Sequence, residues 1–565
     1  MATALPVVNR QPDFLGQLLA EQQELTAVES FSEWHHSQDA STPAQEKYYR
    51  NLIPASAPKP GYQFAFEVDL DACSGCKACV VACHSLNGLE EDESWRRVGT
   101  LIIGDESAES PAAIQHVTTA CHHCEDPGCL NGCPVKAYDK DPITGIVRHL
   151  DDQCIGCKYC TMMCPYEVPR YSDRLGIVRK CDMCHQRLSV GEAPACVQSC
   201  PNEAIRISVV PVGSELYHSD AVVPSAPPSS ITQPTTRFVS SRSIHSSHAQ
   251  PQDKNVDEVA ESHWPLAIML VMTQIAVGVL LAEAIVAGVL LVFGQPVSAK
   301  VTLTTALVAF AIANLGLGIA PLHLGQPLRM WRVFLGLRTS WLSREAVVLG
   351  KFMGAVAAGI GLLALPLVWD WIPEFAQAWI PIELIPSWLG RVVLLASLPL
   401  GALGLYCSAM IYIATKRQLW RQERTLPRFF GTGLAGGPLI TAAVFGVFDF
   451  RWTAFALSLV AIGLLITKFG VERSTYFSES DSDDSYDRRS ARLIRNHMSG
   501  LLQARIGLMT AAIVATALGA LVAIASPIAG GGVLAIASSL FIAGENAERL
   551  LYFKSVVYDR MPGTL

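Results

Sequence analysis

The chain has 565 residues, of which 50% are hydrophobic and only 16% are charged, and its formal net charge is −7. This length allows two or more domains. The charge balance gives no indication of nucleic-acid binding, whereas the low charged fraction and the uneven spread of apolar residues predict a chain that lies partly in a membrane.

Residues 1–60 are polar and contain scattered prolines, which predicts an N-terminal arm that lies on the surface or docks a partner. One short amphipathic stretch runs over about residues 14–25. The first thirty residues have neither a basic start followed by an apolar core nor a twin-arginine pair. We therefore expect no cleavable export signal.

Sixteen of the seventeen cysteines lie between residues 73 and 200, in four blocks of four. The blocks are Cys73, Cys76, Cys79 and Cys83; Cys121, Cys124, Cys129 and Cys133; Cys154, Cys157, Cys160 and Cys164; and Cys181, Cys184, Cys196 and Cys200. The last three blocks end in Cys-Pro, and the third reads C-x-x-C-x-x-C-x-x-x-C-P. Three thiolates this close wrap one cubane, and the fourth tends to bind the neighbouring cluster.

Two other uses of clustered cysteines are structural zinc sites and a disulfide framework. Zinc sites usually pair two C-x-x-C hooks across a longer spacer, and disulfide frameworks belong to exported chains. Four successive quartets fit both patterns badly, so we predict four 4Fe–4S clusters. Their assembly needs free thiolates, which implies maturation in the cytosol.

Short strand-like segments at residues 62–70, 146–150 and 204–210 flank the cysteine blocks. A strand, a cluster loop and a short helix make up a ferredoxin unit. Residues 61–210 are therefore predicted to be an α+β ferredoxin-like domain, in which one two-cluster unit is nested inside another. Residues 211–263 are rich in Ser, Pro and His without apolar periodicity, which predicts a flexible linker.

From residue 264 to the end, long uncharged stretches predict an all-α membrane domain of eight spanning helices. The spans cover about residues 265–293, 301–321, 345–369, 392–414, 429–447, 452–470, 507–527 and 530–550. Four glycines and one proline between residues 431 and 438 predict that the fifth helix is closely packed or kinked.

Basic residues are unequally divided between the connections of these spans. The connections after the second, fourth and sixth helices carry many arginines, whereas the opposite ones offer only Lys300, Arg391 and Arg451. By the positive-inside bias, the basic connections and both ends of the membrane domain face the cytoplasm. The protein is thus predicted to be a multi-pass protein of the cytoplasmic membrane with its cluster domain on the cytoplasmic side.

The cysteine region resembles the four-cluster electron-transfer subunit of dimethyl sulfoxide reductase-type molybdoenzymes. The resemblance covers about residues 62–210 and rests on TACHHCEDPGCLNGCP, CIGCKYCTMMCPYEVPRY and RKCDMCHQRLSVGEAPACVQSCPNEAI. It implies four cluster groups, each of three cysteines and one distant partner. They are Cys73, Cys76, Cys79 with Cys200; Cys181, Cys184, Cys196 with Cys83; Cys121, Cys124, Cys129 with Cys164; and Cys154, Cys157, Cys160 with Cys133. Some relatives lack the residue equivalent to Cys160 and carry a 3Fe–4S centre, so its presence here implies four cubanes.

The membrane domain resembles the quinol-oxidising anchor subunit of the same enzymes, so the chain looks like a fusion of the two. The segment that carries this resemblance is IAPLHLGQPLRMWRVFLGLRTSWLSREAV, residues 319–347. The resemblance implies a separate molybdopterin-containing catalytic subunit, menaquinol or another quinol as substrate, contact with the membrane lipid and its quinone pool, and no haem.

Within that segment, His323 and Glu345 are ionisable residues at the membrane boundary. Such residues are costly in a bilayer and tend to be functional. Quinol oxidation releases protons, which a histidine accepts near neutral pH and a carboxylate relays. The alternative is an interfacial histidine and a glutamate that favours its helix dipole; the resemblance favours the quinol site. Arg329 is a further candidate that could polarise a quinone carbonyl, although topology alone also explains it.

The function predicted from the sequence is electron transfer from quinol through four clusters to a separate reductase subunit. The acceptor stays open between dimethyl sulfoxide, other S- or N-oxides, nitrate and selenium or sulfur oxyanions. One alternative is a quinone-reducing module of an oxidase complex that acts on formate or a sulfur compound. Another is a passive anchor without quinone chemistry.

Overall fold

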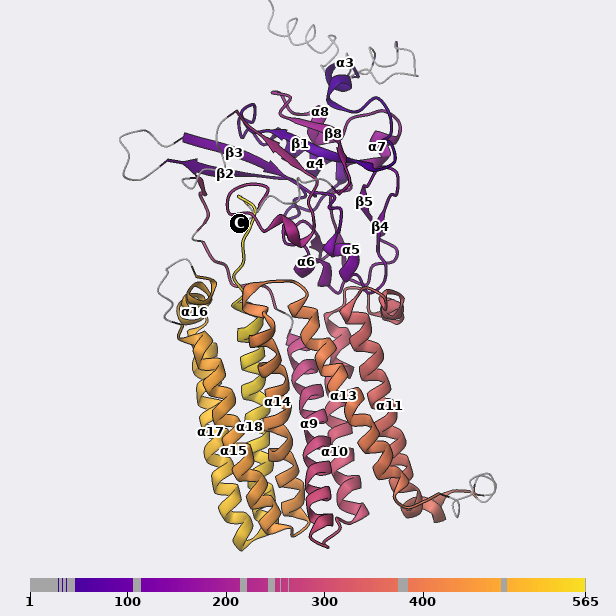
Figure 1. Cartoon of the computed structure of the whole chain (residues 1–565), viewed down its shortest axis with the longest axis vertical. Coiled ribbons are helices and arrows are strands. Elements are labelled where there is room, and N and C mark those ends of the chain that lie inside the picture. The colour runs from indigo at the N-terminus through magenta and orange to yellow at the C-terminus, as the bar shows by residue number, and fades with distance from the viewer. Residues whose placement is uncertain are drawn as a thin grey trace, which may run out of the picture.

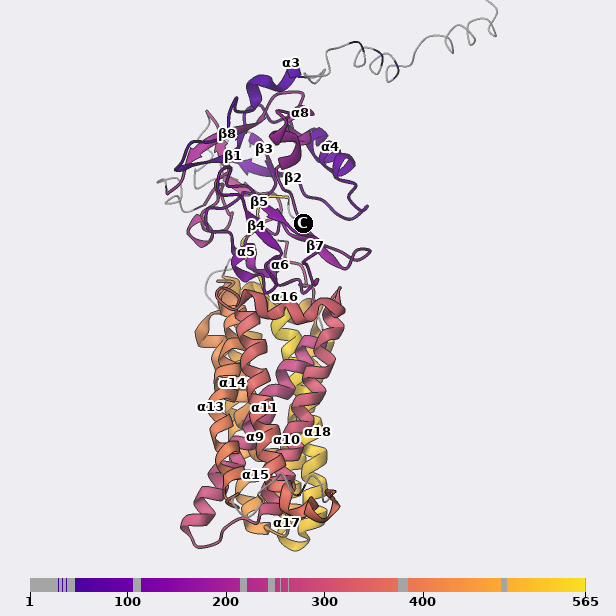
Figure 2. The same cartoon turned by 90° about the vertical axis from the view of Figure 1, so that its right-hand side faces the viewer.

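The computed structural model describes residues 46–104, 113–213, 221–241, 249–254, 256–262, 264–373, 385–478 and 485–563, together with Glu29, Glu33, Ser37 and Gln377. Short strands and helices form a compact upper part, and long helices form a bundle below it (Figure 1). A view turned by 90° shows the same stacking, with the upper part on one end of the bundle (Figure 2). The predicted combination of a ferredoxin-like domain and an all-α membrane bundle is confirmed.

The upper part, called the cluster domain from here on, contains ten short strands in four small sheets among its described residues. The strands are β1 Tyr62–Asp69, β2 Arg97–Ile103, β3 Ala113–Thr119, β4 Tyr138–Lys140, β5 Val147–His149, β6 Arg170–Ser172, β7 Ile177–Arg179, β8 Ile205–Pro211, β9 Arg237–Val239 and β10 Ala249–Pro251. The sheet orders are β8-β1-β9, β10-β2-β3, β4-β5 and β6-β7. The three strands predicted from the sequence correspond to β1, β5 and β8.

Antiparallel pairing of β1 with β8 closes the cluster domain on itself. Val68 lies opposite Ile205 and Phe66 opposite Ile207, and all four side chains are buried. The strand before the first cysteine block therefore pairs with the strand after the last one. This pairing holds the outer ferredoxin unit around the inner one.

Short helices follow the cysteine loops. They are α4 Ala78–Asn87, α5 Gly128–Gly132, α6 Tyr159–Met163, α7 His185–Ser189 and α8 Ala195–Gln198. The N-terminal pieces α3 Glu46–Tyr49 and η1 Arg50–Leu52 also belong to this domain, because Tyr49 and Leu52 are buried against Phe64 and Phe66. The packed domain thus begins before residue 61. The amphipathic stretch at residues 14–25 lies outside the described residues.

The prediction that residues 211–263 form a flexible linker was wrong for the described part of this segment. Strand β9 pairs in parallel with β1, and β10 pairs with β2. Val223 and Ala226 are buried in a small apolar cluster with Leu101 and Val117. Strands of three residues have no measurable alternation in the sequence, and their stability comes from the sheet edges that other segments supply.

The bundle contains eight helices long and apolar enough to span a membrane among the described residues, which confirms the predicted number. They are α9 Trp264–Val292, α10 Ala299–Ile319, α11 Trp341–Val368, α13 Leu389–Ile413, α14 Gln422–Val447, α15 Arg451–Tyr476, α17 Ser499–Ala525 and α18 Pro527–Lys554. Short pieces between them are η4 Ala320–His323, η5 Pro327–Gly336, η6 Trp369–Trp371, η8 Gln418–Trp420 and α16 Tyr486–His497. Most helices extend a turn beyond the predicted apolar core, since polar end residues keep the backbone hydrogen-bonded at the membrane boundary.

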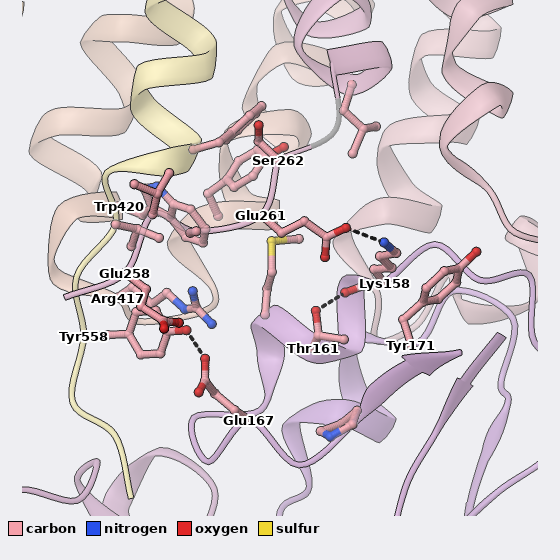
Figure 3. Close-up of a pocket in the computed structure, with 18 of the residues that line it drawn as sticks. Lys158, Thr161, Glu167, Tyr171, Glu258, Glu261, Ser262, Arg417, Trp420 and Tyr558 are labelled. Carbon is pink, nitrogen blue, oxygen red and sulfur yellow. Dashed lines mark hydrogen bonds and ion pairs between the residues drawn. The ribbon is translucent and has the colours of Figure 1, made fainter. Parts of the chain in front are cut away.

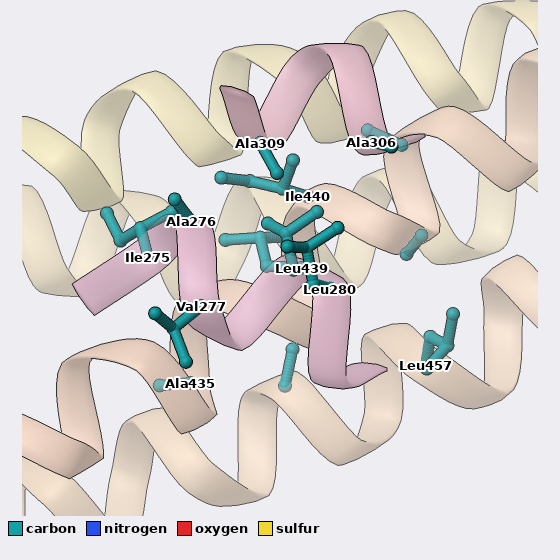
Figure 4. Packing of buried hydrophobic residues seen from close by; sticks show 14 of the residues in the cluster. Ile275, Ala276, Val277, Leu280, Ala306, Ala309, Ala435, Leu439, Ile440 and Leu457 are labelled. Carbon is teal, nitrogen blue, oxygen red and sulfur yellow. The ribbon is translucent and has the colours of Figure 1, made fainter. Parts of the chain in front are cut away.

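Helices α9 and α14 lie at the centre of the bundle and approach each other through glycines. A Cβ atom built on Gly278 would lie 1.9 Å from the carbonyl oxygen of Gly433, and one on Gly437 would lie 2.2 Å from that of Gly278. Only residues without a side chain allow this approach, as predicted for the glycine-rich fifth span. Figure 4 shows the apolar side chains that pack beside it, among them Ala276, Leu280 and Leu439.

The connections α10–α11, α13–α14 and α15–α17 lie at the end of the bundle that carries the cluster domain (Figure 1). These are the three connections rich in arginine. The opposite connections lie at the far end. The charge asymmetry of the sequence therefore separates the two ends of the bundle, and the cluster domain is docked on the basic one.

Candidate iron–sulfur centres and quinol site

Four cysteine loops share a local backbone geometry that turns the chain tightly. Each loop has at least one residue with a positive φ angle, and the first and third loops repeat the same pair: Gly75 and Lys77, then Gly156 and Lys158. Glycine adopts this conformation without strain, and the following lysine is held there by its loop. The repeated sequence C-x-G-C-K-x-C therefore folds twice into the same cradle.

The structure brings the cysteines together in the groups that the resemblance implies. Three separate small cavities are each lined by one such group. They contain Cys73, Cys76, Cys79 and Cys200; Cys121, Cys124, Cys129 and Cys164; and Cys133, Cys154, Cys157 and Cys160. In the fourth group, Cys83 interacts electrostatically with Cys184 and Cys196, and Cys181 with Cys83 and Cys196.

The donor set fits a polynuclear cluster better than zinc or disulfides. All seventeen cysteines are free thiols. Across the described residues, no three Cys, His, Asp or Glu side chains are arranged to hold one metal ion. A cubane places each thiolate on a different iron and so needs a wider cradle than a single tetrahedral ion does.

Backbone N–H groups point at several of these sulfurs. Ala137 N–H donates to Cys133 Sγ at 3.2 Å, Ala204 N–H to Cys200 Sγ at 3.3 Å, and Gly156 N–H to Cys154 Sγ at 3.4 Å. Burial raises the pKa of the Cys133 thiol to about 11. Binding of iron to this loop must therefore displace a proton, and the N–H groups then stabilise the thiolate charge.

Two buried cations lie between neighbouring cysteine groups, and no periodic pattern in the sequence marks them. Lys180, 3% exposed, has its Nζ 3.6 Å from Cys121 Sγ and donates to the carbonyl of Cys181 at 2.8 Å. Arg96, 2% exposed, interacts electrostatically with Cys196 and Cys79. Each cation thus faces two groups at once and offsets the negative charge that cluster-bound thiolates carry.

The group of Cys133, Cys154, Cys157 and Cys160 lies closest to the membrane bundle. Residues 324–343, which we call the docking segment, bind its loops through backbone and side-chain groups. Gln326 N–H donates to Ile155 O at 3.0 Å, Gly336 N–H to Pro134 O at 2.7 Å, and Ser340 Oγ–H to Gly132 O at 2.7 Å.

Arg329 belongs to this docking segment. Its guanidinium donates to the carbonyl oxygens of Asp151 and Cys154, both at 3.3 Å, and Arg332 donates to that of Asp152 at 2.6 Å. Both arginines thus point at the backbone of the cluster loop. Exposed apolar side chains of the same segment, such as Leu328 and Trp331, lie on the surface.

His323 and Glu345 lie at the same end of the bundle but in different surroundings. His323 ends η4, is partly exposed, and its Nδ1 is hydrogen-bonded to Ala320 O. Glu345 lies one turn inside α11, is buried, and accepts a hydrogen bond from Ser408 of α13.

Tyr159 extends from the cluster loop to helix α13 of the bundle. It lies between Cys157 and Cys160 in sequence, is buried, and donates from its hydroxyl to Ile411 O at 3.1 Å. Burial, Cys157 and Glu345, in that order, raise the pKa of its phenol. Tyr159 therefore joins the cluster loop to α13, the helix whose Ser408 donates to the Glu345 carboxyl.

A cavity of about 410 Å³ lies between the cluster domain and the bundle (Figure 3). We call it the interface cavity. Its walls come from the α6 loop with Cys157 and Lys158, from residues 258–262, from the α13–α14 connection, and from the C-terminal residues 553–560. His323, Arg329 and Glu345 are not among its lining residues.

A buried ionic network occupies the last four spanning helices, α14, α15, α17 and α18, near the same end. Arg505 binds Glu472 and Glu545, each at 2.8 Å, Lys468 binds Glu545 at 2.8 Å, and Arg428 binds Glu548 at 3.2 Å. Paired carboxylates of this kind are held by opposite charges inside the membrane part. Their partners lie on four different helices, which a linear sequence does not reveal.

Comparison with known proteins assigns both parts of the molecule. Residues 259–554 match the family described as DMSO reductase anchor subunit (DmsC), and residues 112–210 match a 4Fe-4S dicluster domain. The B subunit of the anaerobic dimethyl sulfoxide reductase of Escherichia coli K12 is 36% identical over 177 residues, which is 30% of this protein and 86% of that subunit. The corresponding B subunit of Haemophilus influenzae is 33% identical over 178 residues, again 30% and 86%.

A third similar protein is the iron-sulfur subunit of the nitrate-inducible formate dehydrogenase of E. coli K12. It is 40% identical over 152 residues, which cover 24% of this protein and 51% of that subunit. The anchor family accounts for the whole bundle, and the reductase B subunit accounts for the cluster domain. The protein therefore belongs to the DMSO reductase anchor subunit (DmsC) family and carries this anchor fused to an iron–sulfur domain related to the B subunit of dimethyl sulfoxide reductase.

Proposed function

We propose that this iron–sulfur and anchor protein oxidises menaquinol or another quinol at the membrane and delivers the electrons to a separate molybdopterin-containing subunit. The observation that carries the proposal is the docking of the Cys133, Cys154, Cys157 and Cys160 loops directly on the membrane bundle. An electron released at this end of the bundle has only a short distance to travel to reach that group.

Four 4Fe–4S clusters, held by the sixteen cysteines in the groups described above, would supply one-electron carriers. The fold positions these groups between the bundle and the outer face of the cluster domain. In the group of Cys73, Cys76, Cys79 and Cys200, Cys76 is exposed, as are its neighbours Ser74 and Lys77. This face is suited to a catalytic partner that takes up the electrons.

His323 and Glu345 are the proposed proton acceptors for quinol oxidation. Removing two electrons from a quinol breaks two O–H bonds, so two protons must leave the headgroup. Glu345 is buried and accepts a hydrogen bond from Ser408 of α13, and His323 lies at the membrane boundary of the same end. General acid–base groups at such positions accept protons without a charged intermediate in the lipid.

Arg329 fits a structural task better than the polarisation of a quinone carbonyl. Its guanidinium binds the carbonyl oxygens of Asp151 and Cys154, so it is engaged with the cluster loop. We therefore assign Arg329 to holding this loop on the bundle.

The first test compares quinol with an artificial electron donor. His323→Ala and Glu345→Gln are expected to lower quinol-dependent reduction by about 100- to 10,000-fold, as for loss of a general base. A reduced viologen dye, which feeds the clusters directly, should still support full reduction.

Two matched controls lie at the same end of the bundle and are exposed: His497→Ala and Glu423→Gln. Both should retain quinol activity. Quinol activity of wild-type magnitude in His323→Ala and Glu345→Gln would instead support a passive anchor without quinone chemistry.

The reverse direction, quinone reduction by an oxidase complex, is the second candidate. The similarity to a formate dehydrogenase iron-sulfur subunit supports considering it. A redox titration separates the two, because a series of uniformly low cluster potentials suits a strong donor such as formate, whereas higher potentials suit electron uptake from quinol. The co-purifying catalytic subunit would identify the terminal acceptor.

A further inference from the structure

We infer that the interface cavity binds the headgroup of the quinol. This inference rests on the proposed function and specifies where its substrate binds. It concerns a different set of residues from the segment 319–347 that carries the anchor resemblance.

The position of the cavity is the first argument. Cys157, a member of the cysteine group nearest the bundle, is one of its lining residues, and so is Met162 of the adjoining helix α6. A headgroup in this space would be in contact with the loop that holds the electron-accepting group. Electron transfer from the headgroup to the cluster held by this loop would then need no other carrier between them.

The shape and chemistry of the walls are the second argument. Tyr412, Trp420, Phe553 and Tyr558 supply aromatic surfaces, and Leu266 supplies an apolar one. A quinol headgroup is a flat ring with an oxygen at each end, and aromatic side chains stack on such rings. A volume of about 410 Å³ lies within the range of small-molecule sites.

The charges around the cavity do not favour an anionic lipid headgroup. Lys158 is paired with Glu261 at 2.6 Å, and the guanidinium of Arg417 stacks on the Tyr558 ring at 3.8 Å from its centroid (Figure 3). Glu258 also lines the space. In all, three carboxylates (Glu167, Glu258 and Glu261) line the cavity beside four cations (Lys158, Arg170, Arg417 and Arg560), so the lining is close to neutral and suits a neutral polar ring.

The surroundings of Tyr412 connect the cavity to a proton acceptor. Tyr412 lines the cavity and lies one helical turn after Ser408 in α13, whose hydroxyl donates a hydrogen bond to Glu345. The cavity therefore favours Glu345, of the two proposed acceptors, as the group that receives protons from a headgroup bound here.

One wall of the cavity is formed by the segment that joins the cluster domain to the membrane bundle. Residues 258–262 connect the cluster domain to α9, and Ala260 N–H is fixed to Lys554 O at 3.0 Å. Filling the space from this wall leaves the aromatic residues unchanged. Ala260→Trp is therefore the informative variant, and Val256→Trp, in the same segment but exposed and outside the lining, is its control.

The test uses the full-length protein in detergent with a photoreactive azido-naphthoquinone, followed by peptide mass spectrometry. The label is expected on peptides that contain Tyr412 to Trp420 or Phe553 to Tyr558, and excess unlabelled naphthoquinone should suppress it. Ala260→Trp should weaken equilibrium binding of the same quinone by about tenfold or more, because the added indole occupies space that the headgroup needs, whereas Val256→Trp should not.

The alternative outcomes separate this inference from the proposed function. Label confined to residues 319–347, with quinol turnover still lost in His323→Ala, would overturn the cavity and leave quinol oxidation intact. A second outcome is label at the cavity that excess phospholipid suppresses and unlabelled quinone does not. This would show that the cavity binds a lipid and would overturn the assignment of the cavity to quinol. Failure of the protein to bind naphthoquinone at any site would overturn the proposed function itself.

Discussion

At the scale of single residues, the buried cations Lys180 and Arg96 lie between cysteine groups, where a positive charge offsets the negative charge of bound clusters. Lys180 faces Cys121 on one side and Cys181 on the other, and these belong to two different groups. A reduced cluster carries one more negative charge than an oxidised one, so a nearby fixed cation favours reduction. Lys180 should thus act on two clusters at once.

Lys180→Met is therefore expected to shift the reduction potentials of two clusters to more negative values and to leave the other two unchanged. Redox titration followed by electron paramagnetic resonance measures all four. Lys180→Arg, which keeps the charge, should restore the potentials, and Lys59→Met, an exposed lysine on the same domain, should have no effect. Unchanged potentials in Lys180→Met would show that solvent screens this charge.

The number of cluster cysteines predicts the iron and sulfide content of the protein. Four cubanes correspond to about sixteen irons and sixteen acid-labile sulfides per molecule of protein. Cys160→Ser should convert or remove one cluster while the other three keep their spectra, because Cys160 belongs to a single group.

Cys407→Ser is the matched control, since Cys407 is buried in α13 outside the four blocks, and it should leave the iron content unchanged. Stoichiometric zinc with little iron in the wild-type protein would contradict the cluster assignment.

At the scale of elements, the docking segment joins the two parts of the molecule. Gly336 lies so close to the cluster loop that an added Cβ would be 2.7 Å from the carbonyl oxygens of both Cys133 and Pro134. Backbone atoms do not yield easily in a packed interface. A side chain at this position must push the cluster loop away from the bundle.

Gly336→Val is thus expected to slow quinol-dependent cluster reduction on the order of 100-fold, the effect of a small misplacement of reacting groups. Iron content and dye-dependent reduction should stay at wild-type values, since the cysteine cradles remain. Gly350→Val in α11, where a Cβ meets no neighbouring atom within 4 Å, is the matched control. Wild-type quinol activity in Gly336→Val would show that the contact does not set the distance for electron transfer.

At the scale of the whole molecule, the distribution of charge predicts the orientation in the membrane. The arginine-rich connections and the cluster domain share one end of the bundle (Figure 1). The positive-inside bias therefore predicts that this end faces the cytoplasm.

Reporter fusions after Arg338, Arg424 and Arg495 should accordingly report the cytoplasm, and fusions after Lys300, Arg391 and Arg451 the outside. Protons from quinol would then leave on the side where the electrons are taken up, so turnover should be electrically silent. A cluster domain that protease digests on intact spheroplasts would contradict this orientation.

The sequence by itself determined the properties that depend on local chemistry. The spacing of cysteines in each block predicts a cluster-binding loop, because three thiolates within a short stretch must share one tight turn of the chain. The eight spans follow from hydropathy, because a bilayer imposes a minimum apolar length on each helix. Strand β1 was found because its residues alternate before the first cysteine block, and β5 and β8 were found as short strand-like segments that flank the later blocks.

Tertiary structure decided everything that joins distant residues. The grouping of Cys83 with Cys181, or of Cys133 with Cys154, came from resemblance to relatives and is visible in the molecule only after it folds. The short strands β9 and β10 exist because β1 and β2 offer free edges. Lys180 and the interface cavity could not be predicted for the same reason: their properties arise from neighbours that belong to other segments, and no periodicity along one segment records which neighbours those are.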